Sequence, residues 1–400
     1  MIIRKKNRNR KWQRKFIKSI FESSNDKTKH FSKIMLQNIN LLNKKNEYLP
    51  KYIFKYYSPT SENILDIKNQ RLWLSHPKSF NDPFDCNIGY DRENYKKSCT
   101  MQIIKENGCI DENNKLDGFT LDDRIRIQNS RLDDYFSFDS KIESYSDVIR
   151  KILNLKSEEF KTKTRNILST KLQQIDNKID KLKNLNIRVA CFSEFEKYEE
   201  FYNQIVMWSH YADNHKGFCI EYDMEFLKSD IHLSQNNLEF NHDKKDEYLK
   251  ERNEAIIKAG LFPIEYTSNR INIPVTKLDL INVDSFERII YNSNIDELFY
   301  KTFVVKSANW NYEKEWRIII DERISNYYDN KIPFPYVKTI YLGCKAEKEL
   351  INTMINIGED IGAEVNILKM DGKKFKLEST GTWSYKYDRD NHKWNNPYIY

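Results

Sequence analysis

The sequence has few glycines and no closely spaced cysteine pair, and these absences exclude several classes of protein. Its ten glycines form neither the GxGxxG turn of dinucleotide-binding folds nor the GxxxxGK[ST] loop that cradles phosphates. Its six cysteines include no CxxC spacing, which argues against a disulfide framework or a thiolate zinc site and predicts a reducing, cytoplasmic compartment. No apolar run is long enough to span a bilayer, and the N-terminus lacks the apolar stretch of a signal peptide. We therefore expect no membrane span and no metal.

The positive charge is concentrated at the N-terminus. Residues 1–50 contain fourteen Lys/Arg and three Asp/Glu, a net charge of +11, so residues 51–400 carry −4 of the total +7. Nine basic residues fall within residues 1–18, where Trp12, Phe16 and Ile20 follow helical spacing. This pattern indicates a solvated or docked basic arm, with nucleic acid as the expected partner of residues 1–18 and an anionic membrane surface as an alternative.

Alternating polar and apolar patterns predict an α+β fold with a mixed sheet. Near the C-terminus a strand, a helix and a second strand follow one another, which predicts a β-α-β element with one parallel strand pair. A further helix is expected at 199–214, with its apolar side chains on one face. The strands and helices predicted from these patterns are 53–58, 61–68, 71–75, 188–194, 218–223, 315–320, 336–342, 345–358 and 365–370.

Residues 92–185 form a charged, helix-favouring insertion. Its apolar residues Leu168, Leu172, Ile175, Ile179 and Leu182 step by four and three, which is the spacing of a helix–helix contact. We expect a helical hairpin that packs on itself, on the body, on a partner or on a second copy as a homo-oligomer. The predicted organisation is a basic arm at 1–48, a core domain at 49–91 and 186–400, and the helical insertion at 92–185.

Four blocks combine polar groups with aromatic residues. They read FKYYS at 54–58, LWLSHPKSFNDPFD at 72–85, a CFSE…MWSHYADNHKGFCIEYD block at 191–223, and KSANWNYEKEWRIII at 306–320. In this order the blocks resemble the bacterial family catalogued as domain of unknown function 2971 (DUF2971). Its recurring pieces are a KY strand, an FNDPFD turn, an MW-SHYA-HKGF segment and a W-YEKEWR strand, and the family name implies no activity.

A second resemblance, to the ADP-ribosyltransferase superfamily, does imply an activity. It concerns a first strand with a polar and aromatic pair, a second strand ending in Ser, and a late strand opening with Glu-x-Glu. The resemblance implies a core of ADP-ribosyltransferase type that uses NAD to modify a nucleic acid or protein, in toxin or anti-phage defence. Carried over residue by residue, it assigns Glu315, Glu313 and Ser75 to catalysis. Lys55, with Tyr57, stands where the superfamily has a His or Arg that holds NAD.

The chemistry of this reaction explains why such residues are required. Cleavage of the nicotinamide–ribose bond passes through an oxocarbenium-like state that a carboxylate stabilises. Aromatic side chains such as Tyr57 and Trp73 are suited to stacking on the nicotinamide ring. Further candidates for contact with NAD are Asn81, Asp82 and His210, although Asn81 and Asp82 also fit a purely structural turn.

Two alternatives stay open at this stage. One is a metal-dependent nuclease or phosphodiesterase, in which carboxylates converge on Mg²⁺. Its candidate ligands are Asp82, Asp85, Glu194, Glu221 and Asp223. The other is a non-catalytic module that senses or binds a nucleotide in an aromatic pocket.

Overall fold

A computed structural model describes most of the chain. The described residues are 39–106, 157–183, 187–230, 245–278, 302–321, 325–383, 387–388 and 393–394. Of the predicted basic arm at 1–48, residues 1–38, which include the basic stretch 1–18, lie outside them. Within the described part, no helix combines the length and apolar character needed to cross a membrane.

The chain divides into two compact units, which are described separately. The larger unit comprises Met1–Cys86, Asn186–Ser268 and Phe303–Tyr400, and the smaller comprises Asn87–Leu185 and Asn269–Thr302. The smaller unit thus includes a second stretch, 269–302, that the sequence analysis placed in the core domain.

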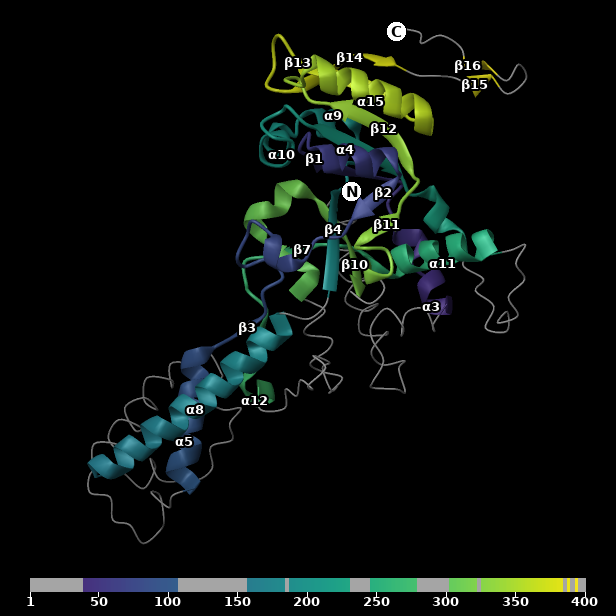
Figure 1. The fold of residues 1–400 in the computed structure, drawn as a ribbon. Helices are drawn as coiled ribbons and strands as arrows, with labels where there is room; N and C mark the ends of the chain where they lie inside the picture. The colour runs from purple at the N-terminus through teal and green to yellow at the C-terminus, as the bar shows by residue number, and fades with distance from the viewer. Residues whose placement is uncertain are drawn as a thin grey trace. The chain divides into compact units, whose positions relative to one another are not determined.

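The larger unit is an α+β fold built on one large mixed sheet (Figure 1). Its eight strands follow the order β14-β13-β12-β5-β1-β4-β10-β6. Within this eight-stranded sheet only β12 and β13 run parallel, and α15 joins them, as the β-α-β pattern predicts. The strands of this sheet are β1 (Tyr52–Tyr57), β4 (Ile187–Ser193), β5 (Phe218–Asp223), β6 (Leu261–Pro263), β10 (Glu315–Asp321), β12 (Val337–Leu342), β13 (Glu364–Met370) and β14 (Leu377–Trp383).

Short strand pairs and helices complete this unit. The remaining strands are β2 (Arg71–Trp73), β7 (Glu265–Thr267), β9 (Val305–Ser307), β11 (Lys331–Pro333), β15 (Tyr387–Asp388) and β16 (Lys393–Trp394). The α-helices are α3 (Ile39–Asn43), α4 (Ser61–Lys68), α9 (Tyr198–Tyr202), α10 (Ile205–Tyr211), α11 (Lys245–Gly260) and α15 (Lys348–Ile361). The 3₁₀ helices are η1 (Asn46–Tyr48), η2 (Pro77–Ser79), η4 (Glu225–Lys228) and η6 (Ala308–Glu313).

The two faces of the sheet form two apolar cores, because side chains alternate along each strand. On β1, Ile53 and Tyr57 belong to one core, which also takes side chains from α4, α11 and α15. Phe54 and Tyr56 belong to the other core, which α9 and α10 cover with Phe201 and Trp208 among others. The predicted alternation along 53–58 is therefore confirmed.

The helix predicted at 199–214 is instead two short helices, α9 and α10. The backbone N–H of Asn203 closes α9 on the carbonyls of Glu200 and Phe201, and asparagine favours such helix ends over helix interiors. After α10, Asp213, Asn214 and His215 all have positive φ angles, so the chain reverses tightly into β5. This reversal brings the end of α10 close to the start of β5.

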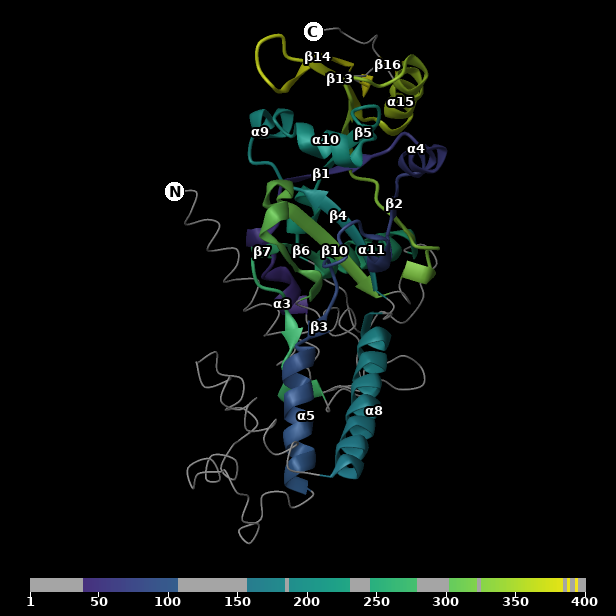
Figure 2. The ribbon, with the colours of Figure 1, turned by 90° about the vertical axis from the view of Figure 1, so that its left-hand side faces the viewer.

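The smaller unit contains a helical hairpin. Helices α5 (Arg92–Glu106) and α8 (Glu158–Lys183) lie side by side in Figure 1 and Figure 2. Tyr90 and Arg92 donate to Asp176, and Lys171 donates to Gln102, which is the order expected of antiparallel helices. The unit also contains β3 (Gly89–Tyr90), β8 (Asn272–Ile273) and α12 (Val275–Leu278). Of the predicted apolar series, Leu172, Ile175 and Ile179 are buried.

Candidate functional site

A cavity lies where strands β1 and β4 separate. The two strands pair at Phe54 and Ser193. Four residues back along β4, Val189 instead exchanges two backbone hydrogen bonds with Ser75. Between these two points the Lys55 ammonium donates to the carbonyl of Cys191 over 3.2 Å. Lys55 thus contacts β4 through its side chain beyond the point where the two strands pair, which we call the fork between β1 and β4.

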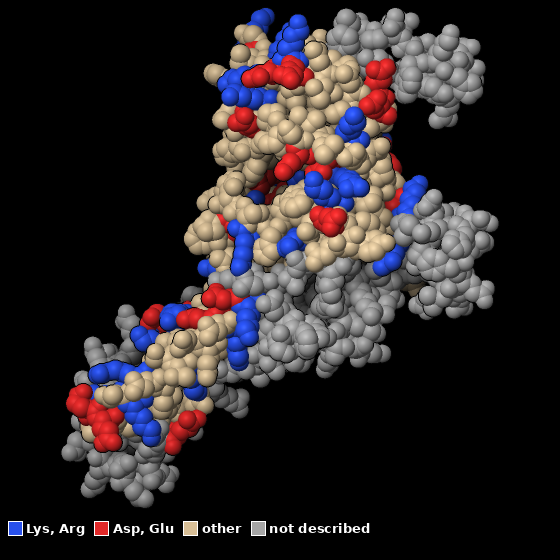
Figure 3. All heavy atoms as spheres, in the orientation of Figure 1, with Lys and Arg blue, Asp and Glu red and all other residues tan. Residues whose placement is uncertain are grey.

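The cavity encloses about 260 Å³ and lies wholly within the larger unit. Five segments far apart in the sequence meet around it: β1, residues 75–85, β4, α10 and residues 306–315. Figure 3 shows a hollow in the surface of this unit where acidic and basic side chains gather. The four sequence blocks therefore converge in space. The predicted site residues that line the cavity are Lys55, Ser75, Asn81, Asp82, Glu313 and Glu315.

Three other predicted residues lie away from the cavity lining. Tyr57 is buried against Phe218, and its hydroxyl pairs with that of Tyr222 at 2.9 Å. Trp73 is 44 % exposed and lies beside Lys331. His210 is exposed, and its ring contacts the Tyr312 hydroxyl at 3.4 Å. Tyr57 and Lys55 do share one strand face, but only Lys55 reaches the fork.

Arg317 organises the charges beneath the cavity, and its side chain is fully buried. Its guanidinium donates to both carboxylate oxygens of Asp85 at 2.9 and 2.6 Å, and to both of Glu315 at 2.6 and 3.1 Å. A further bond at 3.0 Å goes to the backbone carbonyl of Phe303. The planar donor fork of arginine matches such paired carboxylates. Arg317 thus ties the FNDPFD turn to the start of β10.

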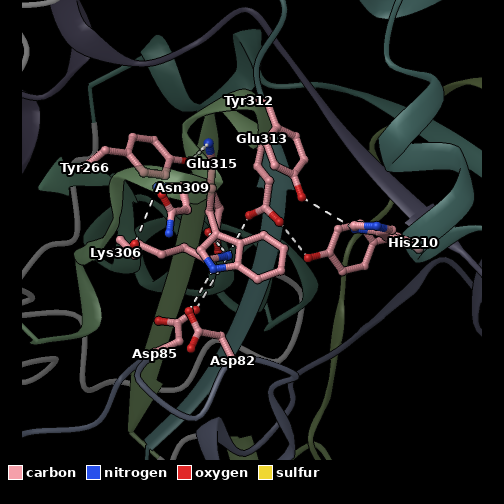
Figure 4. A network of polar contacts seen from close by, with 12 residues as sticks. Asp82, Asp85, His210, Tyr266, Lys306, Asn309, Tyr312, Glu313 and Glu315 are labelled. Carbon is pink, nitrogen blue, oxygen red and sulfur yellow. Dashed lines mark hydrogen bonds and ion pairs between the residues drawn. The ribbon is translucent and has the colours of Figure 1, made fainter. Parts of the chain in front are cut away.

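Lys306 joins three carboxylates on the cavity side of this network. Its ammonium lies 2.6 Å from Glu313, 3.0 Å from Glu315 and 3.6 Å from Asp85. Figure 4 shows Lys306, Glu313 and Glu315 from the segment 306–315 close to Asp85 from the turn at 81–85. The three carboxylates share two cations, Lys306 and Arg317, so the cluster carries one net negative charge when all three are ionised.

The two glutamates of the YEKEW segment occupy different environments. Burial alone raises the pKa of Glu315, but the adjacent Arg317 and Lys306 lower it to about 2. For Glu313, burial and the neighbouring charge of Glu315 raise the pKa, against hydrogen bonds from Lys306 and Tyr211. The Tyr211 hydroxyl donates to Glu313 over 2.6 Å. Two carboxyl groups whose surroundings separate their pKa values are the usual basis for assigning acid–base roles.

The turn at 81–85 is fixed by contacts from two directions. Asp82 accepts a bond from the Trp310 indole at 2.8 Å, and it also caps the turn at Phe84. Asp85 accepts from Arg317, as described above. These contacts hold Trp310 as one wall of the cavity, with Phe80 also lining it.

The candidate Mg²⁺ ligands of the nuclease alternative do not form one cluster. Glu194 accepts from the Trp316 indole, and Asp223 caps η4 at Glu225. Glu221 accepts from Tyr198, Lys338 and Tyr341 and does not line the cavity. In the part of the chain that the structure describes, no group of three or more His, Cys, Asp or Glu is placed to hold a metal ion.

The sequence patterns assigned no role in the site to Lys306, Tyr211, Cys191 or Arg317. Arg317 pairs with Glu315, but its second carboxylate, Asp85, is 232 positions away. No local pattern encodes such a contact. The sequence feature that could have indicated Lys306 and Tyr211 is their place in the blocks that combine polar groups with aromatic residues.

One of three comparisons with known proteins gives a match. The family model described as "Protein of unknown function (DUF2971)" matches residues 207–318. No curated protein and no solved structure matches the chain. The matched stretch runs from α10 into β10 and contains Tyr211, Lys306, Glu313, Glu315 and Arg317. The match supports the family prediction made from the motifs: residues 207–318 of this chain are similar to DUF2971.

Proposed function

We propose that the larger unit is an ADP-ribosyltransferase-like enzyme that cleaves the nicotinamide–ribose bond of NAD and transfers ADP-ribose to a macromolecule. The observation that carries the proposal is the carboxylate pair Glu313 and Glu315, joined by one ammonium in the lining of a cavity. Lys55, which the superfamily resemblance assigns to NAD binding, and Ser75, which it assigns to catalysis, line the same cavity. Convergence of these four residues is what a transferase site requires.

The cavity suits one half of the dinucleotide. At about 260 Å³ it is smaller than the roughly 300–1,000 Å³ of pockets that enclose whole ligands. We propose that the nicotinamide riboside enters and the adenylate half stays outside. Phe80 and Trp310 offer flat apolar faces to the nicotinamide ring, and the carboxylates favour its positive charge.

Glu313 and Glu315 take different roles in the proposed reaction. Glu315 stays ionised because Arg317 and Lys306 both donate hydrogen bonds to its carboxylate. Its fixed negative charge lies near the developing cation. As the C1′–N bond breaks, its electron pair leaves with nicotinamide. The acceptor's oxygen or nitrogen then bonds to C1′, and its proton passes to the Glu313 carboxylate. Glu313 must therefore be ionised at the start of the step.

The proposal also includes a macromolecular target. The basic residues 1–18, which we expect to contact a nucleic acid, lie outside the described residues. Action in toxin or anti-phage defence stays a prediction, as do a cytoplasmic location and a partner or second copy held by the helical insertion.

Release of nicotinamide from NAD⁺, in the presence of nucleic acid or cell lysate, tests the proposal. Replacement of Glu313 by Gln should lower the rate about 10²–10³-fold, as expected for loss of a transition-state contact. Glu221→Gln is the matched control, because Glu221 is a fully buried carboxylate with a lysine and two tyrosine partners outside the cavity. Circular dichroism establishes that both variants are folded.

Two results would contradict the proposal. One is a wild-type protein that releases no nicotinamide with any acceptor. The other is a folded Glu313→Gln variant as active as the wild type. Tight NAD⁺ binding without release would favour the sensing module instead.

A further inference from the structure

Tyr211 connects helix α10 to the buried carboxylates Glu313, Glu315 and Asp85 by a hydrogen bond to Glu313. Its hydroxyl donates to Glu313 Oε1 over 2.6 Å, while Lys306 donates to Oε2 over 2.6 Å. Each carboxylate oxygen of Glu313 thus has one donor from a different segment of the chain. Two donors on opposite oxygens fix the plane of the carboxylate as well as its position.

The two donors are not equivalent. The Lys306 ammonium is shared among Glu313, Glu315 and Asp85, so its charge is not devoted to Glu313. A phenol has a single hydrogen to donate, and that of Tyr211 goes to Glu313. Burial raises the pKa of the Tyr211 phenol, so the group stays a donor at any working pH.

The surroundings of Glu313 include groups that favour its protonated form and groups that favour its ionised form. Burial and the charge of Glu315 favour the protonated form of Glu313, whereas Lys306 and Tyr211 favour its ionised form. The titratable and charged groups that face Glu313 are Tyr211 from α10, Tyr266 from β7, Lys306 from β9, Tyr312 from η6 and Glu315 from β10. Of these, Tyr211 and Lys306 hydrogen-bond to its carboxylate.

The position of Tyr211 is set by its own helix. Trp208, one turn earlier on α10, is fully buried in the core on that face of the sheet. The tight reversal after α10 is held by Gly217, where an added Cβ would lie 2.1 Å from the Tyr57 carbonyl oxygen. The end of α10 therefore cannot shift without disturbing β1, the strand that carries Lys55.

We infer that Tyr211 is a positioning residue that holds the Glu313 carboxylate ionised and correctly oriented at the cavity. This inference rests on the proposed function, because it assigns Tyr211 a part in the proton transfer to Glu313. It identifies the MWSHYA segment of the sequence as a contributor to catalysis through α10. In this arrangement the Lys306 ammonium binds the three carboxylates, and the Tyr211 hydrogen bond favours the ionised form of Glu313, which accepts the proton.

The test is Tyr211→Phe, which removes only the hydroxyl. The control is Tyr312→Phe, because the Tyr312 hydroxyl contacts His210 rather than the Glu313 carboxylate and Tyr312 does not line the cavity. Two quantities are measured: the pH profile of kcat for nicotinamide release, and the titration of the Glu313 carboxyl by NMR in protein labelled with ¹³C-glutamate, with Glu313→Gln used to assign the signal.

In Tyr211→Phe the acid limb of kcat and the NMR midpoint should both move to higher pH, by about one to two units for a hydrogen bond to a charged group. KM should change by less than about twofold, because Tyr211 acts on the proton-transfer group and not on ground-state binding. The control should show neither shift. An unchanged Glu313 midpoint in Tyr211→Phe would overturn the inference. If the wild type releases no nicotinamide, the proposed function fails, and the NMR titration still decides whether Tyr211 holds Glu313 ionised.

Discussion

Replacing Arg317 with methionine leaves two buried carboxylates without their main cation. Asp85 and Glu315 would each lose two hydrogen bonds to the guanidinium. Lys306 would remain, but it lies 3.0 Å from Glu315 and 3.6 Å from Asp85 and also serves Glu313. Breaking a buried ion pair by removing one partner costs about 3–5 kcal/mol. Since domains are stable by about 5–15 kcal/mol, Arg317→Met should remove a large share of the free energy of unfolding.

Urea denaturation followed by tryptophan fluorescence measures this loss. The control is Lys369→Met, which breaks an ion pair with Glu378 whose two side chains are both exposed and should cost no more than about 1 kcal/mol. A triple variant in which Asp85→Asn and Glu315→Gln accompany Arg317→Met should recover much of the stability, because it no longer buries unpaired charge. A loss below 1 kcal/mol in Arg317→Met, or no recovery in the triple variant, would refute the reasoning.

Two further predictions concern the stability of glycine variants and the loss of stability at low pH. Gly217→Ala should destabilise the protein by more than about 2 kcal/mol, because its Cβ would lie 2.1 Å from the Tyr57 carbonyl oxygen. Gly362→Ala has open space around the added Cβ and a φ of +74°, and should cost only about 1 kcal/mol in thermal denaturation; equal losses would argue against the clash. The pKa of Glu315 is lowered to about 2 in the folded state, so its contribution to stability is present above the unfolded value near 4.3 and is lost as the pH falls toward 2. The free energy of unfolding, measured in urea between pH 6 and 2, should therefore decline by roughly 3 kcal/mol from this group. Arg317→Met should largely abolish that part of the decline, and an unchanged slope would contradict the assignment.

Several elements of the fold could be predicted because their signals are local. The pattern over 61–68 predicts a helix, and Thr60 caps it by accepting a hydrogen bond from the N–H of Asn63. The same holds for the parallel β-α-β element near the C-terminus, whose helix is amphipathic and ends at Gly362. Periodicity and capping residues suffice for such segments.

The candidate site was predicted only in part, because its geometry depends on long-range strand pairing. The side chains of Lys55 and Tyr57 lie on the same face of β1. The strands β1 and β4 separate beside Lys55, however, whereas Tyr57 is buried in the core. Similarly, the strand predicted at 71–75 would place Trp73 and Ser75 on one face, but β2 ends at Trp73 and Ser75 pairs separately with Val189 at the cavity. The pairing partner of each strand, which no local window contains, decides these outcomes.

The most direct test of the central claim is the position of NAD⁺ in a crystal of the protein soaked with it. The proposal predicts density for the nicotinamide ribose in the cavity, with a ribose hydroxyl or C1′ within reach of Glu313 and with Lys55 and Ser75 in contact with the ligand. Glu221, outside the cavity, should make no contact. Density at another place, or a cavity that stays free of NAD⁺ at millimolar concentration while the crystal still diffracts, would contradict the account.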